Sequence, residues 1–176
     1  MRFEQTPVTG AFVVELEPRG DERGFFARAF CAREFAEHGL EPHVVNANLA
    51  HSVAAGTTRG LHFQDVAAPE AKFFRTVRGA TFNVVVDMRS TSPTYRQWFG
   101  VELTADNRRG LYIPPVCAAG YQTLVDDTEI MYLASGFYSP AAERGVRQDD
   151  PAIGVAWPRE RAVVSDKDRA WPLLDA

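Results

Sequence analysis

Short segments of apolar, β-branched and aromatic residues recur along the whole chain, with turn-forming residues between them. Arg78-Gly79, Ser92-Pro93 and Asp106-Asn107 stand in three of these intervals. The spacing predicts an all-β sandwich or barrel, because each segment suffices for one strand and the turn residues reverse the chain. The predicted strands are Phe12–Leu16, Val44–Val45, Lys72–Val77, Thr81–Met88, Gln97–Leu103, Gly110–Ile113, Tyr121–Val125 and Glu129–Ala134.

Long helices have little room in this pattern. The best helix candidate is Ala32–His38, which is followed by Gly39, where a left-handed C-terminal cap belongs. A second short helical turn is predicted at Ser165–Ala170. No linker, repeat or low-complexity stretch divides the chain, so residues 1–176 are predicted to form one domain.

The alternation of side chains within the predicted strands separates polar from apolar faces. In Thr81–Met88, one face carries Phe82, Val84, Val86 and Met88, and the other carries Asn83, Val85 and Asp87. His62 likewise shares a face with Gln64, and Lys72 shares one with Phe74. A barrel interior that holds a few polar groups among aromatic side chains predicts a ligand cavity, since small barrels otherwise fill with apolar side chains.

Composition excludes several classes of function. The 176 residues carry a net charge of −4 without a basic cluster, which argues against nucleic-acid binding. No apolar run is long enough to cross a bilayer, and the first ten residues do not resemble an export signal, so a cytoplasmic location is predicted. Cys31 and Cys117 are far apart and lack metal-ligand spacing, which favours reduced, packed thiols.

Four polar segments contain the candidate chemistry: Asp21–Phe25, Arg59–Gln64 with Lys72, Glu129–Tyr132 and Ser165–Asp168. Together they supply an imidazole base, cations, a phenol and a carboxylate. These groups could remove a proton next to a carbonyl, stabilise the enolate and return a proton from the opposite side. Read separately, His62 could be a core histidine, Tyr132 a barrel-filling aromatic and Lys72 a surface lysine.

A family resemblance connects these segments. The strings DERGFF, RGLHFQ, VDMRSTSPTY, IPPVCAAGYQTL, FYSP with Glu143, DDPAIGVAWP and SDKD follow one another in this order. With this spacing, from Phe12 to Leu174, the chain resembles the dTDP-4-dehydrorhamnose 3,5-epimerase family. RGLH followed by Lys72, together with SDKD near the C-terminus, is highly specific in combination.

The resemblance implies a cupin-type jelly-roll β-barrel with a few short helices, a homodimer, and catalysis without a metal or other cofactor. The implied substrate is a nucleoside-diphosphate 4-keto-6-deoxyhexose, epimerised at C3 and, as an open question, at C5, in the biosynthesis of a polysaccharide or natural product. By the resemblance, His62 is the general base, Asp168 its partner, Lys72 the group that stabilises the enolate, and Tyr132 the general acid. The positions implied for binding the substrate are Arg23, Asn48, Arg59, Asn83, Ala119, Tyr138, Glu143 and Lys167.

Three positions depart from the family pattern. Ala119 stands where a histidine is usual, Asn83 where an aspartate is usual, and Arg28 where a glutamate is common. Asn83 can form hydrogen bonds but does not offset a positive imidazole. These departures indicate an altered substrate or stereochemical outcome.

Two other functions stay open at this point. The chain could bind a nucleotide sugar without catalysis, with Asn83 and Ala119 as signs of a decayed site, or it could be a related barrel 3,4-ketoisomerase. Metal-binding cupins use a pair of histidines separated by one residue. The corresponding string here is His62-Phe63-Gln64, which lacks the second imidazole, so no metal site is predicted.

Overall fold

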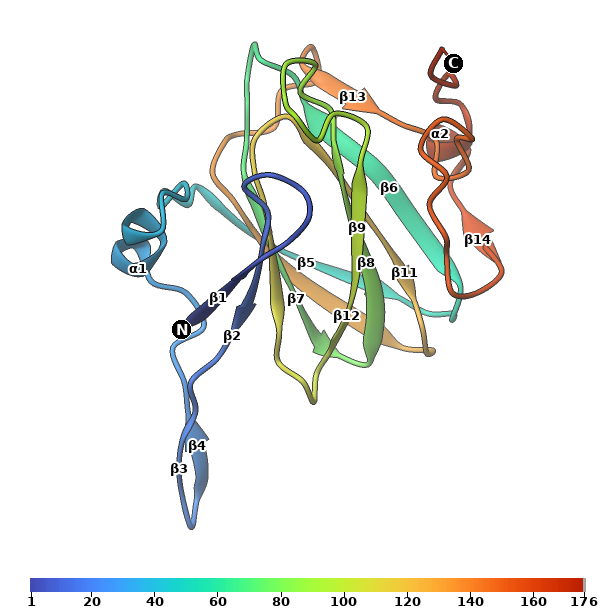
Figure 1. The fold of residues 1–176 in the computed structure, drawn as a ribbon. Coiled ribbons are helices and arrows are strands. Elements are labelled where there is room, and N and C mark those ends of the chain that lie inside the picture. The colour runs from blue at the N-terminus through green and yellow to red at the C-terminus, as the bar shows by residue number, and fades with distance from the viewer. Residues whose placement is uncertain (176) are drawn as a thin grey trace.

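The computed structural model describes residues 1–175, which build two β-sheets packed face to face (Figure 1). The first sheet runs in the order β1 (Arg2–Gln5), β2 (Phe12–Glu15), β10 (Gly110–Ile113), β7 (Lys72–Arg78), β12 (Thr128–Ala134) and β5 (Asn46–Ser52). The second runs in the order β13 (Glu143–Gly145), β6 (Thr57–Gln64), β11 (Cys117–Thr123), β8 (Ala80–Asp87) and β9 (Trp98–Thr104). Two antiparallel sheets in this arrangement are typical of a jelly roll.

Three further elements lie outside these sheet orders. The short strand β14 (Val163–Val164) pairs in parallel with β6, next to its N-terminal end. The hairpin of β3 (Arg19–Asp21) and β4 (Gly24–Phe26) projects from the body of the molecule (Figure 1). It forms a separate two-stranded sheet.

The main core lies between the two sheets. Phe74 and Ile130 from the first sheet pack there with Val85 and Leu103 from the second. The opposite face of the second sheet is also buried, because residues 146–157 cover Val84 and its neighbours. The predicted division of Thr81–Met88 into two faces is therefore correct: one face points into the barrel, and the other packs beneath the C-terminal segment.

Both predicted helices are present at the expected places. Helix α1 (Ala32–Glu37) is followed by Gly39 at φ +71°, the left-handed conformation that glycine adopts without steric cost. Phe35 of this helix packs on Phe73 and Tyr112 of the first sheet. Helix α2 (Asp166–Arg169) is capped by Ser165, whose hydroxyl accepts a hydrogen bond from the Asp168 N–H at 3.1 Å.

The sequence pattern missed or misplaced some strands. The predicted strand Val44–Val45 is wrong: both valines are exposed, and β5 begins at Asn46. Its sequence, NANLAHS, lacks the β-branched residues that usually indicate a strand. Strand β6 was not among the predicted strands, although the alternation around His62 is correct, and the short β1, β3, β4, β13 and β14 were also missed.

Strand β11 begins at Cys117 rather than at the predicted Tyr121. The sequence pattern missed the first half of this strand because that half, CAAG, consists of small residues, which do not indicate a strand. Those small residues have a packing role. A Cβ at Gly60 of β6 would lie 2.6 Å from the Ala119 carbonyl oxygen, and one at Gly120 would lie 2.7 Å from the Arg59 carbonyl oxygen. The close approach of β6 to β11 therefore depends on both glycines.

Candidate active site

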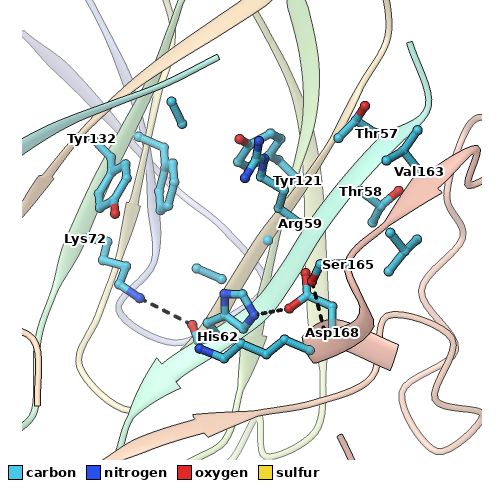
Figure 2. A pocket seen from close by; sticks show the side chains of 16 residues that line it. Thr57, Thr58, Arg59, His62, Lys72, Tyr121, Tyr132, Val163, Ser165 and Asp168 are labelled. Carbon is cyan, nitrogen blue, oxygen red and sulfur yellow. Dashed lines mark hydrogen bonds and ion pairs between the residues drawn. The ribbon is translucent and has the colours of Figure 1, made fainter. Parts of the chain in front are cut away.

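A cavity of about 430 Å³ lies between the two sheets (Figure 2). The first sheet contributes side chains from β5, β7 and β12, and the second contributes β6 and β11; the segment from β14 into α2 closes one side. Its lining residues are Ala50, Thr57, Thr58, Arg59, His62, Lys72, Phe74, Ala119, Gly120, Tyr121, Tyr132, Val163, Val164, Ser165, Lys167 and Asp168. All four residues predicted to carry the chemistry thus line one cavity.

A second cavity of about 240 Å³ adjoins the first, and His62, Lys72 and Tyr132 line both. It is more polar, and we call it the polar lobe. Its other lining residues are Asn46, Asn48, Phe63, Gln64, Glu70, Ala134, Tyr138 and Glu143. The three shared side chains therefore stand where the two spaces meet.

His62 and Asp168 form a close pair in the site. His62 Nε2 lies 2.5 Å from Asp168 Oδ1, although 106 positions separate the two residues in the sequence. The parallel pairing of β14 with β6 carries α2 to the back of the His62 strand, which explains how they meet. The Asp168 side chain is 4% exposed and that of His62 is 32% exposed, so the carboxylate is buried behind an imidazole that reaches the cavity.

The surroundings of Asp168 keep its carboxylate ionised. Burial by itself raises a carboxyl pKa, but hydrogen bonds from His62 and from the Gly60 N–H outweigh burial, so the pKa of Asp168 is lowered. The Gly60 N–H donates to Oδ2 at 3.2 Å, while Oδ1 faces His62. An ionised Asp168 only accepts, so His62 carries a proton on Nε2 and leaves Nδ1 free to accept one.

Tyr132 and Lys72 come from the sheet opposite His62. The Tyr132 ring stacks on Phe74, with centroids 4.9 Å apart and planes at 21°. Burial, followed by the charge of Glu70, raises the pKa of Tyr132, so its hydroxyl is protonated at neutral pH. Lys72 Nζ lies 3.5 Å from the His62 carbonyl oxygen and 2.9 Å from Glu70 Oε1. A proton donor thus stands across the cavity from the imidazole, while an ammonium from the same sheet as that donor reaches the backbone of His62.

Most of the residues predicted to bind substrate lie around the same space. Arg59 and Lys167 line the main cavity, while Asn48, Tyr138 and Glu143 line the polar lobe. Glu143 joins two of them, accepting from Lys167 Nζ at 2.5 Å and from the Tyr138 hydroxyl at 2.8 Å. In this arrangement, cations and hydroxyls surround the cavity mouth.

The positions that depart from the family pattern differ in location. Ala119 lines the cavity and is the direct cross-strand partner of His62. Asn83 does not reach the cavity: it is 1% exposed and donates to the Thr81 hydroxyl at 2.6 Å. Arg28 pairs with Glu34 of α1 at 3.1 Å, outside both cavities.

Arg23 is the predicted binding residue that lies farthest outside the site. It belongs to the turn of the β3–β4 hairpin, has a side chain 82% exposed and pairs with Asp21. No residue of that hairpin lines either cavity. The described part of a single chain therefore does not bring Arg23 to His62.

Some lining residues escaped the sequence-based prediction. Thr57, Thr58 and Tyr121 line the main cavity, and Glu70 lines the polar lobe. Alternation offered a clue to Glu70, because it stands two positions before Lys72. Cys117 does not belong to the site; burial raises the pKa of its thiol to about 12, which supports its prediction as a packed thiol.

The two-sheet barrel and the paired imidazole and carboxylate in its cavity define a class of protein, namely jelly-roll proteins with an acid–base pair in an internal site. The sequence model for dTDP-4-dehydrorhamnose 3,5-epimerase matches residues 5–176. A relative of that name from Methanothermobacter thermautotrophicus is 42% identical over 176 residues, covering 98% of this chain and 94% of the relative. The chain belongs to the dTDP-4-dehydrorhamnose 3,5-epimerase family.

Two further relatives extend the comparison. A dTDP-4-dehydrorhamnose 3-epimerase from Streptomyces niveus is 38% identical, covering 99% of this chain and 84% of the relative. The crystal structure of the Bacillus anthracis 3,5-epimerase with TDP and PPi bound has a TM-score of 0.93 at 38% identity, covering 98% of this chain and 99% of that one. The predicted cupin-type jelly roll and the predicted isomerase class are confirmed by these comparisons.

In residues 1–175, no group of three or more His, Cys, Asp and Glu side chains is arranged to hold a metal ion. None of the helices in that range is long and apolar enough to span a membrane.

Proposed function

We propose that this chain epimerises a dTDP-linked 4-keto-6-deoxyhexose at C3, and at C5 as a second centre, without a metal or other cofactor. One observation carries the proposal. His62 is bound through Nε2 to a buried carboxylate, while its Nδ1 faces a cavity that also holds the Tyr132 phenol from the opposite sheet. The names of the relatives support dTDP as the nucleotide, and they include both 3,5- and 3-epimerases.

Each step of the proposed reaction uses one of these groups. His62 Nδ1 takes the proton from the carbon next to the C4 ketone, and Asp168 stabilises the imidazolium that forms. The electrons of the broken C–H bond move onto the C4 oxygen, where the Lys72 ammonium stabilises the enolate. Tyr132 then donates its phenolic proton to the carbon from the other face of the sugar. Proton exchange with water restores His62 and Tyr132.

Cations of the main cavity suit the diphosphate. Arg59 and Lys167 both line it, and an arginine fork pairs with two phosphate oxygens at once. The polar lobe, with Asn48, Tyr138 and Glu143, suits the sugar hydroxyls. Asn83 supports the barrel wall beneath Tyr121, its cross-strand partner, so its influence on the substrate is indirect. We propose that residues 1–176 form a single domain, which carries every residue of this site except Arg23.

We also propose a homodimer in which Arg23 of one copy approaches the cavity of the other. The β3–β4 hairpin supports this, because Phe25 and Phe26 of β4 are 50% and 75% exposed, and large apolar side chains gathered on a projecting element favour an interface. Arg23→Ala is expected to raise KM by roughly tenfold with little change in kcat, because a charged contact to phosphate contributes about 1.5 kcal/mol or more. Sedimentation at a dimer mass checks the assembly, and a monomer with full activity would disprove it.

The proposed reaction is tested by incubating candidate nucleotide sugars with the enzyme in D₂O. Epimerisation should place one deuteron at C3 and, if both centres react, a second at C5, because Tyr132 exchanges its proton with solvent. Mass spectrometry counts the deuterons, and NMR locates them against an enzyme-free control. Binding without any deuterium would mean a non-catalytic nucleotide-sugar protein, and a ketone moved from C4 would mean a ketoisomerase; either result would overturn the proposal.

A further inference from the structure

Glu70 is a partly buried acid that the reaction described above does not use. It lies two residues before Lys72, where β7 begins, its side chain is 10% exposed, and it lines the polar lobe together with Lys72 and Tyr132. Lys72 Nζ, 2.9 Å away, is its only ion-pair partner within residues 1–175. Taking a carboxylate even partly out of water costs free energy, so an acid in this position beside the cavity indicates a role.

The backbone around Glu70 is held tightly to the end of β12. Ala71 donates its N–H to the Ser135 hydroxyl at 2.8 Å, and Ser135 donates its N–H to the Ala71 carbonyl at 3.0 Å. Gly136 lets the two segments approach, since a Cβ there would lie 3.2 Å from Glu70 Cβ. The segment that directly follows β12, the strand of Tyr132, therefore fixes the backbone beside Glu70.

We propose that Glu70 is a positioning residue of the epimerase, whose carboxylate anchors the Lys72 ammonium on the side of the cavity that carries Tyr132. This inference rests on the proposed roles of Lys72 and Tyr132. An ion pair limits the places that a flexible lysine can occupy, which fixes the ammonium where the C4 oxygen becomes negative. A fixed negative charge beside a phenol opposes formation of the phenolate.

Several charged or titratable groups line the cavities beside Tyr132, and Glu70 is the acid that contributes most to the raised pKa of its hydroxyl. Lys72 approaches from β7, His62 from β6, Tyr121 from β11 and Glu143 from β13. After burial, Glu70 is the largest contributor to the raised pKa of Tyr132, ahead of Tyr121. Glu143 already pairs with Lys167 and accepts from Tyr138, so much of its charge is offset.

The test compares the pH dependence of kcat for the wild type and for Glu70→Gln. Removing the charge should move the basic limb of the pH profile to lower pH, because Tyr132 then loses its proton more readily. We expect kcat at the optimum to fall roughly tenfold and KM to change less than about twofold, since an anchored ammonium serves the enolate more than the substrate. Glu15→Gln is the matched control. Glu15 is the last residue of β2, forms ion pairs with Arg2 and Arg109, and lines neither cavity.

Two further variants separate the outcomes. Glu70→Asp keeps the charge but shortens the side chain, so the basic limb should stay in place while kcat falls at least threefold; this variant also serves if Glu70→Gln does not fold. A basic limb and kcat like those of Glu15→Gln would overturn the role of Glu70.

Tyr132→Phe should abolish most turnover; if it does and Glu70→Gln behaves like the control, only this inference fails. If Tyr132→Phe retains wild-type turnover, the proposed reaction fails and the role of Glu70 falls with it.

Discussion

Replacing His62 by asparagine is expected to lower turnover by roughly 10²- to 10⁴-fold, the usual contribution of a positioned general base. Asparagine keeps a polar side chain of similar reach, but its amide does not take a proton from carbon near neutral pH. The fold should persist, because His62 is only partly buried and its strand is held by β11 and β13 on either side. Turnover is measured by NMR of the product, with deuterium uptake from D₂O as an independent record of proton removal.

The control for this substitution is His51→Asn. His51 lies on β5, is 44% exposed at its side chain, pairs with Asp127 and lines neither cavity. It contacts Arg59 only through its main-chain carbonyl, which the substitution leaves in place. The control should therefore match the wild type within about twofold. A His62→Asn enzyme that keeps more than a tenth of wild-type turnover would remove His62 from the role of base.

The local pattern of the sequence predicted the strands whose residues favour strands, and it failed where they do not. Thr81–Met88 is rich in valine, and its two faces were placed correctly. Strand β5 consists largely of asparagine, alanine and serine, so its strand character comes from pairing with β12 along its whole length. Tertiary pairing of this kind overrides propensity and leaves no local mark in the sequence.

The site shows the same division between local and long-range information. Alternation grouped Lys72 with Phe74, and both do line the cavity. The meeting of His62 with Asp168 depends on β14 joining β6 in parallel, which no local pattern predicts; the family resemblance supplied that pairing. Arg23 marks a further limit, because a single chain leaves it outside both cavities, on the projecting β3–β4 hairpin.

Asp168→Asn should lower kcat about as much as loss of the base itself, by roughly 10²- to 10⁴-fold, because the amide enforces the wrong tautomer of His62. Asp168 accepts from two fixed donors, the Gly60 N–H at Oδ2 and His62 Nε2–H at Oδ1. An asparagine has one oxygen to offer. If that oxygen faces Gly60, the NH₂ group faces His62 and requires Nε2 to accept, which moves the imidazole proton to Nδ1 and blocks the base.

The other amide orientation keeps the tautomer of His62 but destabilises the site. It places the NH₂ group against the Gly60 N–H, so a buried donor is left without an acceptor. Substrate binding should be nearly unchanged in either orientation, so the loss appears in kcat rather than in KM; Asp168→Asn with wild-type kcat would show that the carboxylate does not control the tautomer.

Stability provides a second and independent measurement on Asp168→Asn. The folded pKa of Asp168 is lowered, so its carboxylate stabilises the folded state above the ordinary carboxyl pKa, and this contribution is lost as the pH falls through the lowered value. Asparagine does not titrate. The difference in free energy of unfolding between wild type and variant should therefore be largest near neutral pH and shrink below about pH 4. Urea unfolding at both pH values measures it, and a difference that does not change with pH would mean that the Asp168 carboxylate gains nothing from His62 and Gly60.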